Sequence, residues 1–160
     1  MNWHVLYVHP RCEKKMAEFC GILRLNHYLP LRRETKVYQR RRVTVDKPVF
    51  PGYFFCSFDQ EGRVGVLQTN IVVRIIEVPR QRQLLHELAQ IRKALSIDPT
   101  LGAVEALKKG RRVRICGGPF GGVEGVVDAL KASTKVLLNV DMIGQAVAVE
   151  VDRDLVEIVE

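Results

Sequence analysis

The residues best suited to chemistry in this chain form a short basic segment, residues 31–47. It carries seven Lys or Arg against two acids, with valines and one tyrosine, Tyr38, interleaved. Guanidinium groups bind phosphates in a planar, bidentate geometry, and an aromatic ring stacks on unpaired bases. The segment therefore predicts a nucleic-acid contact, and its candidate residues are Arg32, Arg33, Lys36, Arg40, Arg41 and Arg42. The alternative is a solvated, charged turn that only prevents edge-to-edge association of strands.

An aromatic stretch from Pro48 to Cys56 follows the basic segment directly. Its two prolines cannot donate to a central strand ladder, so they mark the entry to a strand, which we expect over residues 53–58. A concentration of aromatic residues also suits a protein partner, because such side chains carry much of the energy of interfaces. Whether these rings contact a partner or only fill the core stays open at this point.

Catalytic and metal-binding patterns do not stand out. The four histidines are scattered, and no Ser/His/Asp, Cys/His or paired-carboxylate arrangement accompanies them. The four cysteines form no C-x-x-C pair, so we expect no zinc site and no disulfide scaffold, but reduced and buried thiols. Residues 117–122 resemble a phosphate-cradling loop only in glycine content, since no Lys-Ser/Thr and no helix follow. We therefore expect no enzyme activity, metal or cofactor.

Periodicity predicts an α+β sandwich for the first part of the chain, with helices packed on a mainly antiparallel sheet. The basic segment would be a long exposed hairpin or loop inserted before the aromatic strand. The short helix at 61–68 should direct Val64 and Leu67 inward, and the longer helix carries an apolar stripe of leucines and isoleucine. The expected order is strand 3–8, helix 11–25, a strand from 28, the hairpin, strand 53–58, helix 61–68, strand 71–76 and helix 80–95.

The remainder of the chain predicts a small β-barrel. Tight-turn signals separate five short strand candidates, as is typical of such barrels. Before them, residues 96–109 lose the helical periodicity and are expected to be a linker with one helical turn at 103–107. The expected domains are therefore 1–95, the linker 96–109, and 110–160. The strand candidates are 113–116, 125–127, 135–140, 146–151 and 155–159.

Charge divides the chain in the same place. Residues 111–160 hold six Lys or Arg against eight Asp or Glu, a net charge of −2. Because the whole chain carries +7, the first 110 residues carry +9. This division favours two modules with different partners, the basic one first. The N-terminus lacks the basic and apolar regions of a signal peptide, and no apolar run reaches transmembrane length. We expect a cytoplasmic monomer with no membrane contact.

Three stretches together resemble the NusG family of transcription elongation factors, which joins an N-terminal NGN domain to a C-terminal KOW domain with an SH3-like β-barrel. Trp3 to Val8 running into Arg11 to Lys15 is similar to the opening strand and helix of an NGN domain. Phe50 to Phe55 is similar to the F-P-G-Y signature. Gly110 to Val127 resembles a KOW motif, with its characteristic residues at Gly118, Pro119, Phe120 and Gly125.

The resemblance implies a non-enzymatic regulator of transcription elongation, a processivity or antitermination factor. Its NGN domain would dock on the clamp helices of the largest RNA polymerase subunit through Tyr7, Phe50, Pro51 and Tyr53. The basic segment would contact the non-template DNA of the transcription bubble. The KOW domain would bind a second protein, ribosomal protein NusE or Rho, at Met142 and Ile143.

Two departures favour a specialised paralogue, RfaH-like in role, over the general factor. The chain reads Ile71 to Pro79 where general NusG proteins carry a V-x-G-F-[VI]-G-like segment, and Ile143-Gly144-Gln145 where the family's F-G-R turn contacts Rho or NusE. The rival function is a ribosome-associated or RNA-binding KOW protein. The −2 charge of the C-terminal module and the F-P-G-Y strand argue against that rival.

Overall fold

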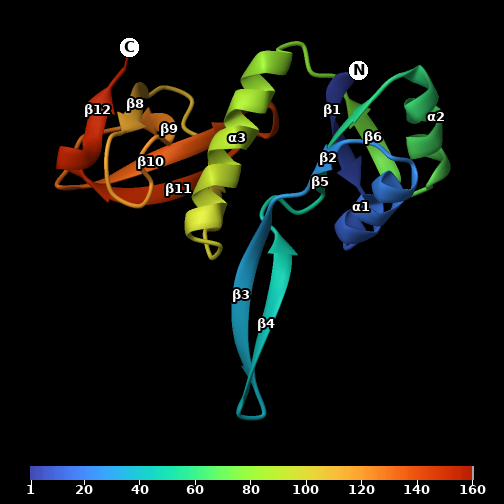
Figure 1. Cartoon of the computed structure of the whole chain (residues 1–160), viewed down its shortest axis with the longest axis horizontal. Coiled ribbons are helices and arrows are strands. Elements are labelled where there is room, and N and C mark those ends of the chain that lie inside the picture. Colours follow the sequence, from blue (N-terminus) through green and yellow to red (C-terminus); the bar gives the residue numbers. More distant parts are fainter. Residues whose placement is uncertain (160) are drawn as a thin grey trace. The chain divides into compact units, whose positions relative to one another are not determined.

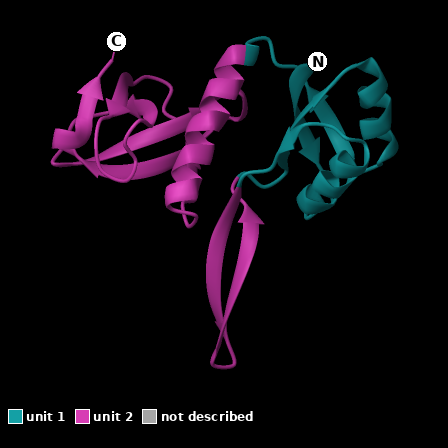
Figure 2. Cartoon of the chain, viewed as in Figure 1, with its two compact units in different colours: residues 1–30, 50–81 teal, residues 31–49, 82–160 magenta. Residues whose placement is uncertain are grey.

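The computed structural model describes residues 1–159. The chain forms two compact units, residues 1–30 with 50–81 and residues 31–49 with 82–160 (Figure 2). Each unit is therefore assembled from segments that are separated in the sequence. The basic segment and the last helix, which we expected to belong with the first domain, fall in the second unit. The predicted domain boundaries near residues 95 and 110 do not coincide with the limits of these compact units. The boundaries stay a prediction.

The first unit is a four-stranded antiparallel sheet with two helices (Figure 1). The strand order is β2-β5-β1-β6, so the aromatic strand lies beside the N-terminal strand in the middle of the sheet. Its strands are β1 (Asn2–Val8), β2 (His27–Tyr28), β5 (Tyr53–Phe58) and β6 (Val72–Ile76), and its helices are α1 (Glu13–Ile22) and α2 (Gln60–Gln68).

Alternation along β1 and β5 gives the sheet two different faces. Leu6 and Phe54 share one face and form a buried cluster with Met16 and Cys20 of α1 and with Val66 of α2. Because side chains alternate along a strand, Tyr7 and Tyr53 lie on the other face. Asp59 is the N-cap of α2, and its side chain accepts a hydrogen bond from the Gly62 amide at 2.8 Å.

The second unit contains a hairpin, a long helix and a six-stranded antiparallel sheet of order β12-β8-β9-β10-β11-β7. The hairpin is a separate two-stranded sheet. All five C-terminal strands expected from the sequence form, while the closed SH3-like barrel stays a prediction. The elements are β3 (Leu31–Tyr38), β4 (Arg41–Pro48), α3 (Gln81–Ile97), β7 (Ala103–Glu105), β8 (Arg111–Ile115), β9 (Glu124–Val127), β10 (Ser133–Val140), the 3-10 turn η1 (Asp141–Ile143), β11 (Gln145–Asp152), the 3-10 turn η2 (Arg153–Leu155) and β12 (Val156–Ile158).

Several local expectations were wrong. The predicted linker contains β7 in place of a helical turn, because residues 103–105 pair with β11. In α2, Val64 and Leu67 are exposed and Val66 is buried. Cys116 is exposed, although Cys20 and Cys56 are buried as expected. The predicted order of elements and the antiparallel α+β class are confirmed.

Candidate functional site

An exposed aromatic patch, formed by Tyr7, Pro51 and Tyr53, marks the end of the aromatic strand. Tyr7 of β1 lies directly opposite Tyr53 of β5, and the two rings make an edge-on contact with centroids 5.3 Å apart. The Tyr7 side chain is 39% exposed, Tyr53 is half-buried, and Pro51 is exposed. Rings that are fixed against each other yet open to solvent lose little conformational freedom when a partner covers them. The geometry suits an anchor for a protein surface.

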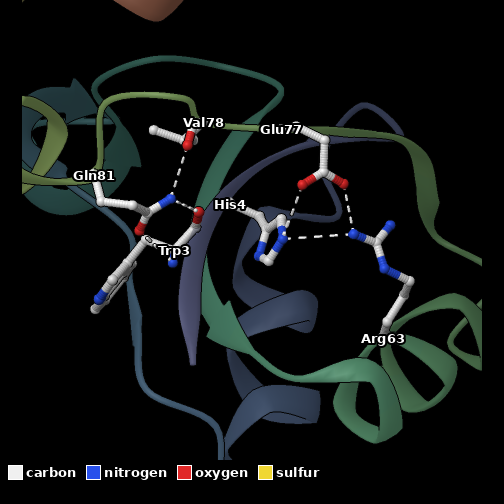
Figure 3. A network of polar contacts seen from close by, with 6 residues as sticks. All are labelled: Trp3, His4, Arg63, Glu77, Val78 and Gln81. Carbon is white, nitrogen blue, oxygen red and sulfur yellow. Dashed lines mark hydrogen bonds and ion pairs between the residues drawn. The ribbon is translucent and has the colours of Figure 1, made fainter.

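Phe50, the fourth residue predicted for this contact, lies elsewhere. Its side chain is 1% exposed, so it is a core residue in this structure and not a member of the aromatic patch. Trp3 is half-buried. Its backbone amide and carbonyl both bond to the Gln81 side chain, at 2.7 and 2.8 Å, and Gln81 also donates to the Val78 carbonyl (Figure 3). These bonds connect β1 with the segment that follows β6, and none of them involves the aromatic patch.

The patch depends on a tight turn at Gly52. This residue has a φ of +88°, which L side chains rarely adopt, and a Cβ there would lie 3.0 Å from the Tyr7 ring. The Gly52 carbonyl accepts a bond from the Val8 amide at 2.8 Å, and the Gly52 amide donates to Glu13 Oε2 at 2.9 Å. Both the amide and the carbonyl of Gly52 are therefore hydrogen-bonded, and these two bonds fix the turn of the F-P-G-Y segment.

Glu13 is a functional residue that our sequence reasoning quoted only within a motif. It is 5% exposed and lies in the first turn of α1. The signal was its spacing, because Glu13, Met16 and Cys20 fall on one helical stripe, and an acid on an apolar stripe needs a buried donor. Here that donor is the Gly52 amide, so the start of α1 positions the aromatic patch.

Replacing Glu13 by alanine should therefore lower the free energy of unfolding by about 2 kcal/mol, since a buried amide would lose its acceptor. Glu13→Gln retains an acceptor oxygen and should lose less. Urea denaturation followed by circular dichroism measures both, with Glu18→Ala as the control, because Glu18 is an exposed acid of the same helix. Equal stability of the Glu13→Ala and Glu18→Ala variants would contradict the role of this bond.

A polar network covers another edge of the first unit (Figure 3). Glu77 bridges His4 at 3.2 Å and Arg63 at 2.5 Å, and the His4 ring stacks on Phe58 with centroids 4.1 Å apart. Burial lowers the pKa of His4 below its ordinary value despite the nearby carboxylate, while the bond from Arg63 lowers the pKa of Glu77. The network ties α2 to β1 and to the segment after β6, which is a structural role.

The hairpin holds all six residues predicted for nucleic-acid contact, but it does not present them equally. Arg32 is half-buried near the base, 3.7 Å from Glu34, and Arg33 lies 3.9 Å from Asp46. Lys47 bonds Glu34 at 2.9 Å, and this bond lowers the pKa of the Glu34 carboxyl. Arg33 is nevertheless exposed, as are the remaining predicted residues, Lys36, Arg40, Arg41 and Arg42.

The tip of the hairpin is built from side chains that turns usually avoid. Gln39 and Arg40 connect the strands, and both have positive φ, +45° and +65°. Two-residue turns of this kind favour asparagine and glycine, because other residues pay a steric cost there. The chain nevertheless carries an exposed cation, Arg40, in this turn.

The predicted KOW motif forms the turn between β8 and β9. Gly118 has a φ of +73° and its carbonyl accepts the Gly121 amide at 3.1 Å; Pro119 is exposed and Phe120 is half-buried. Gly125 lies on β9, where the backbone passes closest to β10. Met142 and Ile143, the predicted partner-binding residues, are half-buried in η1 between β10 and β11.

A polar contact joins α3 to the C-terminal sheet, and it was not foreseen from the sequence. Gln90, 5% exposed, accepts the Glu124 amide at 2.9 Å, and Gln83 donates to Asp141 at 2.6 Å. Burial, and then the nearby Asp141, raise the pKa of Glu87 to about 7. An open cleft of about 420 Å³ runs along this contact. Helix α3 therefore has an apolar stripe and a side with polar contacts. The periodicity of the sequence predicted only the stripe.

Metal-binding clusters are absent from residues 1–159, where no group of three or more His, Cys, Asp or Glu could hold an ion. In the same residues no helix is long and apolar enough to cross a membrane.

The family model that matches this chain places it among non-enzymatic transcription factors. More specifically, the chain belongs to the NusG family, because the family model described as transcription termination factor nusG matches residues 1–94, more than half of its length. A relative from Borreliella burgdorferi, the transcription termination/antitermination protein NusG, is 21% identical over 179 residues, covering 97% of each chain. The solved structure of Thermotoga maritima NusG matches with a TM-score of 0.52 and 20% identity, over 99% of this chain and 97% of that one, and supports the fold alone.

Proposed function

We propose that this chain is a processivity or antitermination factor that binds transcribing RNA polymerase and the displaced DNA strand. The single observation that carries the proposal is the pairing, in a NusG-family chain, of an exposed aromatic patch on one unit with an exposed cationic hairpin on the other. Two such surfaces suit two chemically different partners, an apolar protein surface and a polyanion.

The aromatic patch is the proposed contact with the clamp helices of the largest polymerase subunit. Tyr7, Pro51 and Tyr53 supply the exposed surface; the Phe50 side chain is buried, and the Phe50 carbonyl accepts a hydrogen bond from the Tyr53 amide. A factor can shift the polymerase between its open, paused state and its closed state only by binding one of them more tightly. Stronger binding to the closed clamp would therefore suppress pausing.

The hairpin is the proposed contact with the non-template strand of the bubble. Exposed cations of the hairpin, among them Lys36, Arg40 and Arg41, are the proposed phosphate contacts, and such contacts do not read sequence. The C-terminal sheet is the proposed site for a second protein, Rho or NusE, at Met142 and Ile143. Ile143 and Gln145 stand in the turn in place of an aromatic residue and an arginine, which favours a specialised, RfaH-like paralogue. The proposed factor acts as a monomer in the cytoplasm.

An in vitro elongation assay tests the proposal directly. On a template that carries a pause and an intrinsic terminator, adding the full chain to bacterial RNA polymerase should shorten the pause and increase read-through. The control is the chain with both Tyr7 and Tyr53 replaced by alanine, which should restore the pattern of polymerase alone. Unchanged pausing and read-through, together with recovery of ribosomes but no polymerase in a pull-down, would support the ribosome-associated rival.

A further inference from the structure

The two faces of the hairpin differ in composition, and the strand register defines them. Tyr38 pairs with Arg41 and Lys36 pairs with Val43, and directly paired residues of an antiparallel ladder project to the same side. Residues alternate between sides along each strand, so every paired position, 31–38 and 41–48, can be assigned. The tyrosine face is Arg32, Glu34, Lys36, Tyr38, Arg41, Val43, Val45 and Lys47. The opposite face is Leu31, Arg33, Thr35, Val37, Arg42, Thr44, Asp46 and Pro48.

Positive charge is concentrated on the tyrosine face. It carries four Lys or Arg against one acid, whereas the opposite face carries two against one. Glu34 pairs with Arg32 and Lys47 on the tyrosine face, and Asp46 pairs with Arg33 on the other. Lys36 and Lys47 approach each other on the tyrosine face, and the neighbouring ammonium lowers the pKa of Lys36. An anion placed between crowded cations relieves their repulsion, so this face gains more from a phosphate than the other does.

The tyrosine face also offers the only aromatic ring of the hairpin. The Tyr38 ring is 68% exposed and lies across from Arg41, with Val43, 41% exposed, two pairs further down the ladder on the same face. Val37 holds the equivalent position on the opposite face, where it is 72% exposed. A flat ring beside cations is the arrangement that proteins use for unpaired bases, whose π-faces are hidden in a duplex. An aliphatic side chain cannot supply that stacking.

We propose that the tyrosine face of the hairpin binds single-stranded nucleic acid, with one unpaired base stacked on Tyr38 and the flanking phosphates on Lys36 and Arg41. The opposite face does not contact the strand. This assignment rests on the proposed role of the hairpin as a nucleic-acid arm, and it adds which side of the arm is used and which side chain stacks on a base.

Two neighbouring arginines provide a matched test, because Arg41 and Arg42 lie next to each other on β4, are both exposed, and point to opposite faces. The full chain and its variants would be titrated by fluorescence anisotropy into a labelled single-stranded DNA of about 16 nucleotides, the upper end of common site sizes. Arg41→Ala should weaken binding several-fold and lower the salt slope by about 0.7, the value for one phosphate contact on a single strand. Arg42→Ala should leave both nearly unchanged.

The stacking step has its own matched pair. Tyr38→Ala should weaken binding to the single strand about tenfold, as the loss of one stacked base would, while Val37→Ala should have little effect. Tyr38→Phe keeps the ring and should restore binding. The same variants on a duplex of equal length should show no dependence on Tyr38, and an RNA oligonucleotide of the same sequence tells whether the displaced DNA or a transcript is the better ligand.

The outcomes separate the face assignment from the proposed function. Equal losses in the Arg41→Ala and Arg42→Ala variants, or a Tyr38→Ala variant that binds the single strand like the unmodified chain, would overturn the tyrosine face while the hairpin remained a nucleic-acid arm. Unchanged binding when Arg40, Arg41 and Arg42 are all replaced by alanine would overturn the arm itself. Binding to RNA but not to DNA would contradict the non-template contact and leave the face assignment in place.

Discussion

A Gly125→Ala variant is expected to lose about 3 kcal/mol of unfolding free energy, at the upper end of what overpacking costs. A Cβ on Gly125 would lie 2.7 Å from the Leu137 carbonyl oxygen and 2.7 Å from Val136 Cγ1. Neither neighbour can move cheaply, since one is backbone of β10 and the other is a buried side chain. The approach of β9 to β10 therefore requires glycine. Denaturant unfolding of the full chain would measure the loss.

The control for this variant is Gly21→Ala. Gly21 lies in α1, and a Cβ there would meet nothing within 4 Å. Alanine is the better helix former, so Gly21→Ala should leave stability unchanged or raise it by up to about 1 kcal/mol. The two substitutions add the same methyl group and should act in opposite directions. A Gly125→Ala variant as stable as the unmodified chain would mean that the strands separate without cost.

Replacing Tyr53 by alanine is expected to weaken binding to RNA polymerase by about 2 kcal/mol, which corresponds to roughly thirtyfold in Kd. Tyr53 touches Tyr7 edge-on, so each ring holds the other in the exposed patch. Tyr7→Ala should consequently cost a similar amount, and the double variant should lose less than the sum of the two. Titration of polymerase core enzyme without nucleic acid, by surface plasmon resonance, measures these affinities.

Tyr38→Ala is the matched control, because it removes an exposed tyrosine from the hairpin and should leave affinity for nucleic-acid-free polymerase unchanged. Folding of each variant is checked by its thermal unfolding midpoint. Loss of affinity in the Tyr38 variant, with full affinity in a folded Tyr53 variant, would reverse the proposed roles of the two surfaces.

The sequence predicted the elements of residues 1–97 well, because they are encoded by local patterns. The aromatic strand, the apolar stripe of α3 and the charged hairpin each follow from composition or periodicity within a short window. Exposure was harder to predict. Phe50 and Tyr53 are three residues apart in one motif, yet Phe50 is buried and Tyr53 is half-exposed, because the turn at Gly52 separates them. Only the folded chain shows which ring faces solvent.

The features that could not be predicted depend on contacts between distant segments. Strand β7 has only three residues and exists because β11 offers it an edge, so its own sequence carries no strand signal. Gln90 is a polar residue whose burial depends on the Glu124 amide, far away in the chain. In α2 a glycine on either side of Val64 weakens the stripe, and Val66 was the buried residue. Local periodicity does not predict the pairing of β7, the burial of Gln90 or the burial of Val66.

The hairpin is a two-stranded sheet on its own, and this has a consequence for its dynamics. Isolated two-stranded ribbons are marginally stable in water, and both faces of this one are largely open to solvent. Its turn residues, Gln39 and Arg40, add a steric cost at the point farthest from the base. Local opening of the tip therefore costs far less free energy than unfolding of either unit, so amide protons of residues 36–43 exchange with solvent well before those of β5. The arm frays from its tip while its base, where the Arg33 amide bonds the Pro99 carbonyl at 2.6 Å, stays closed.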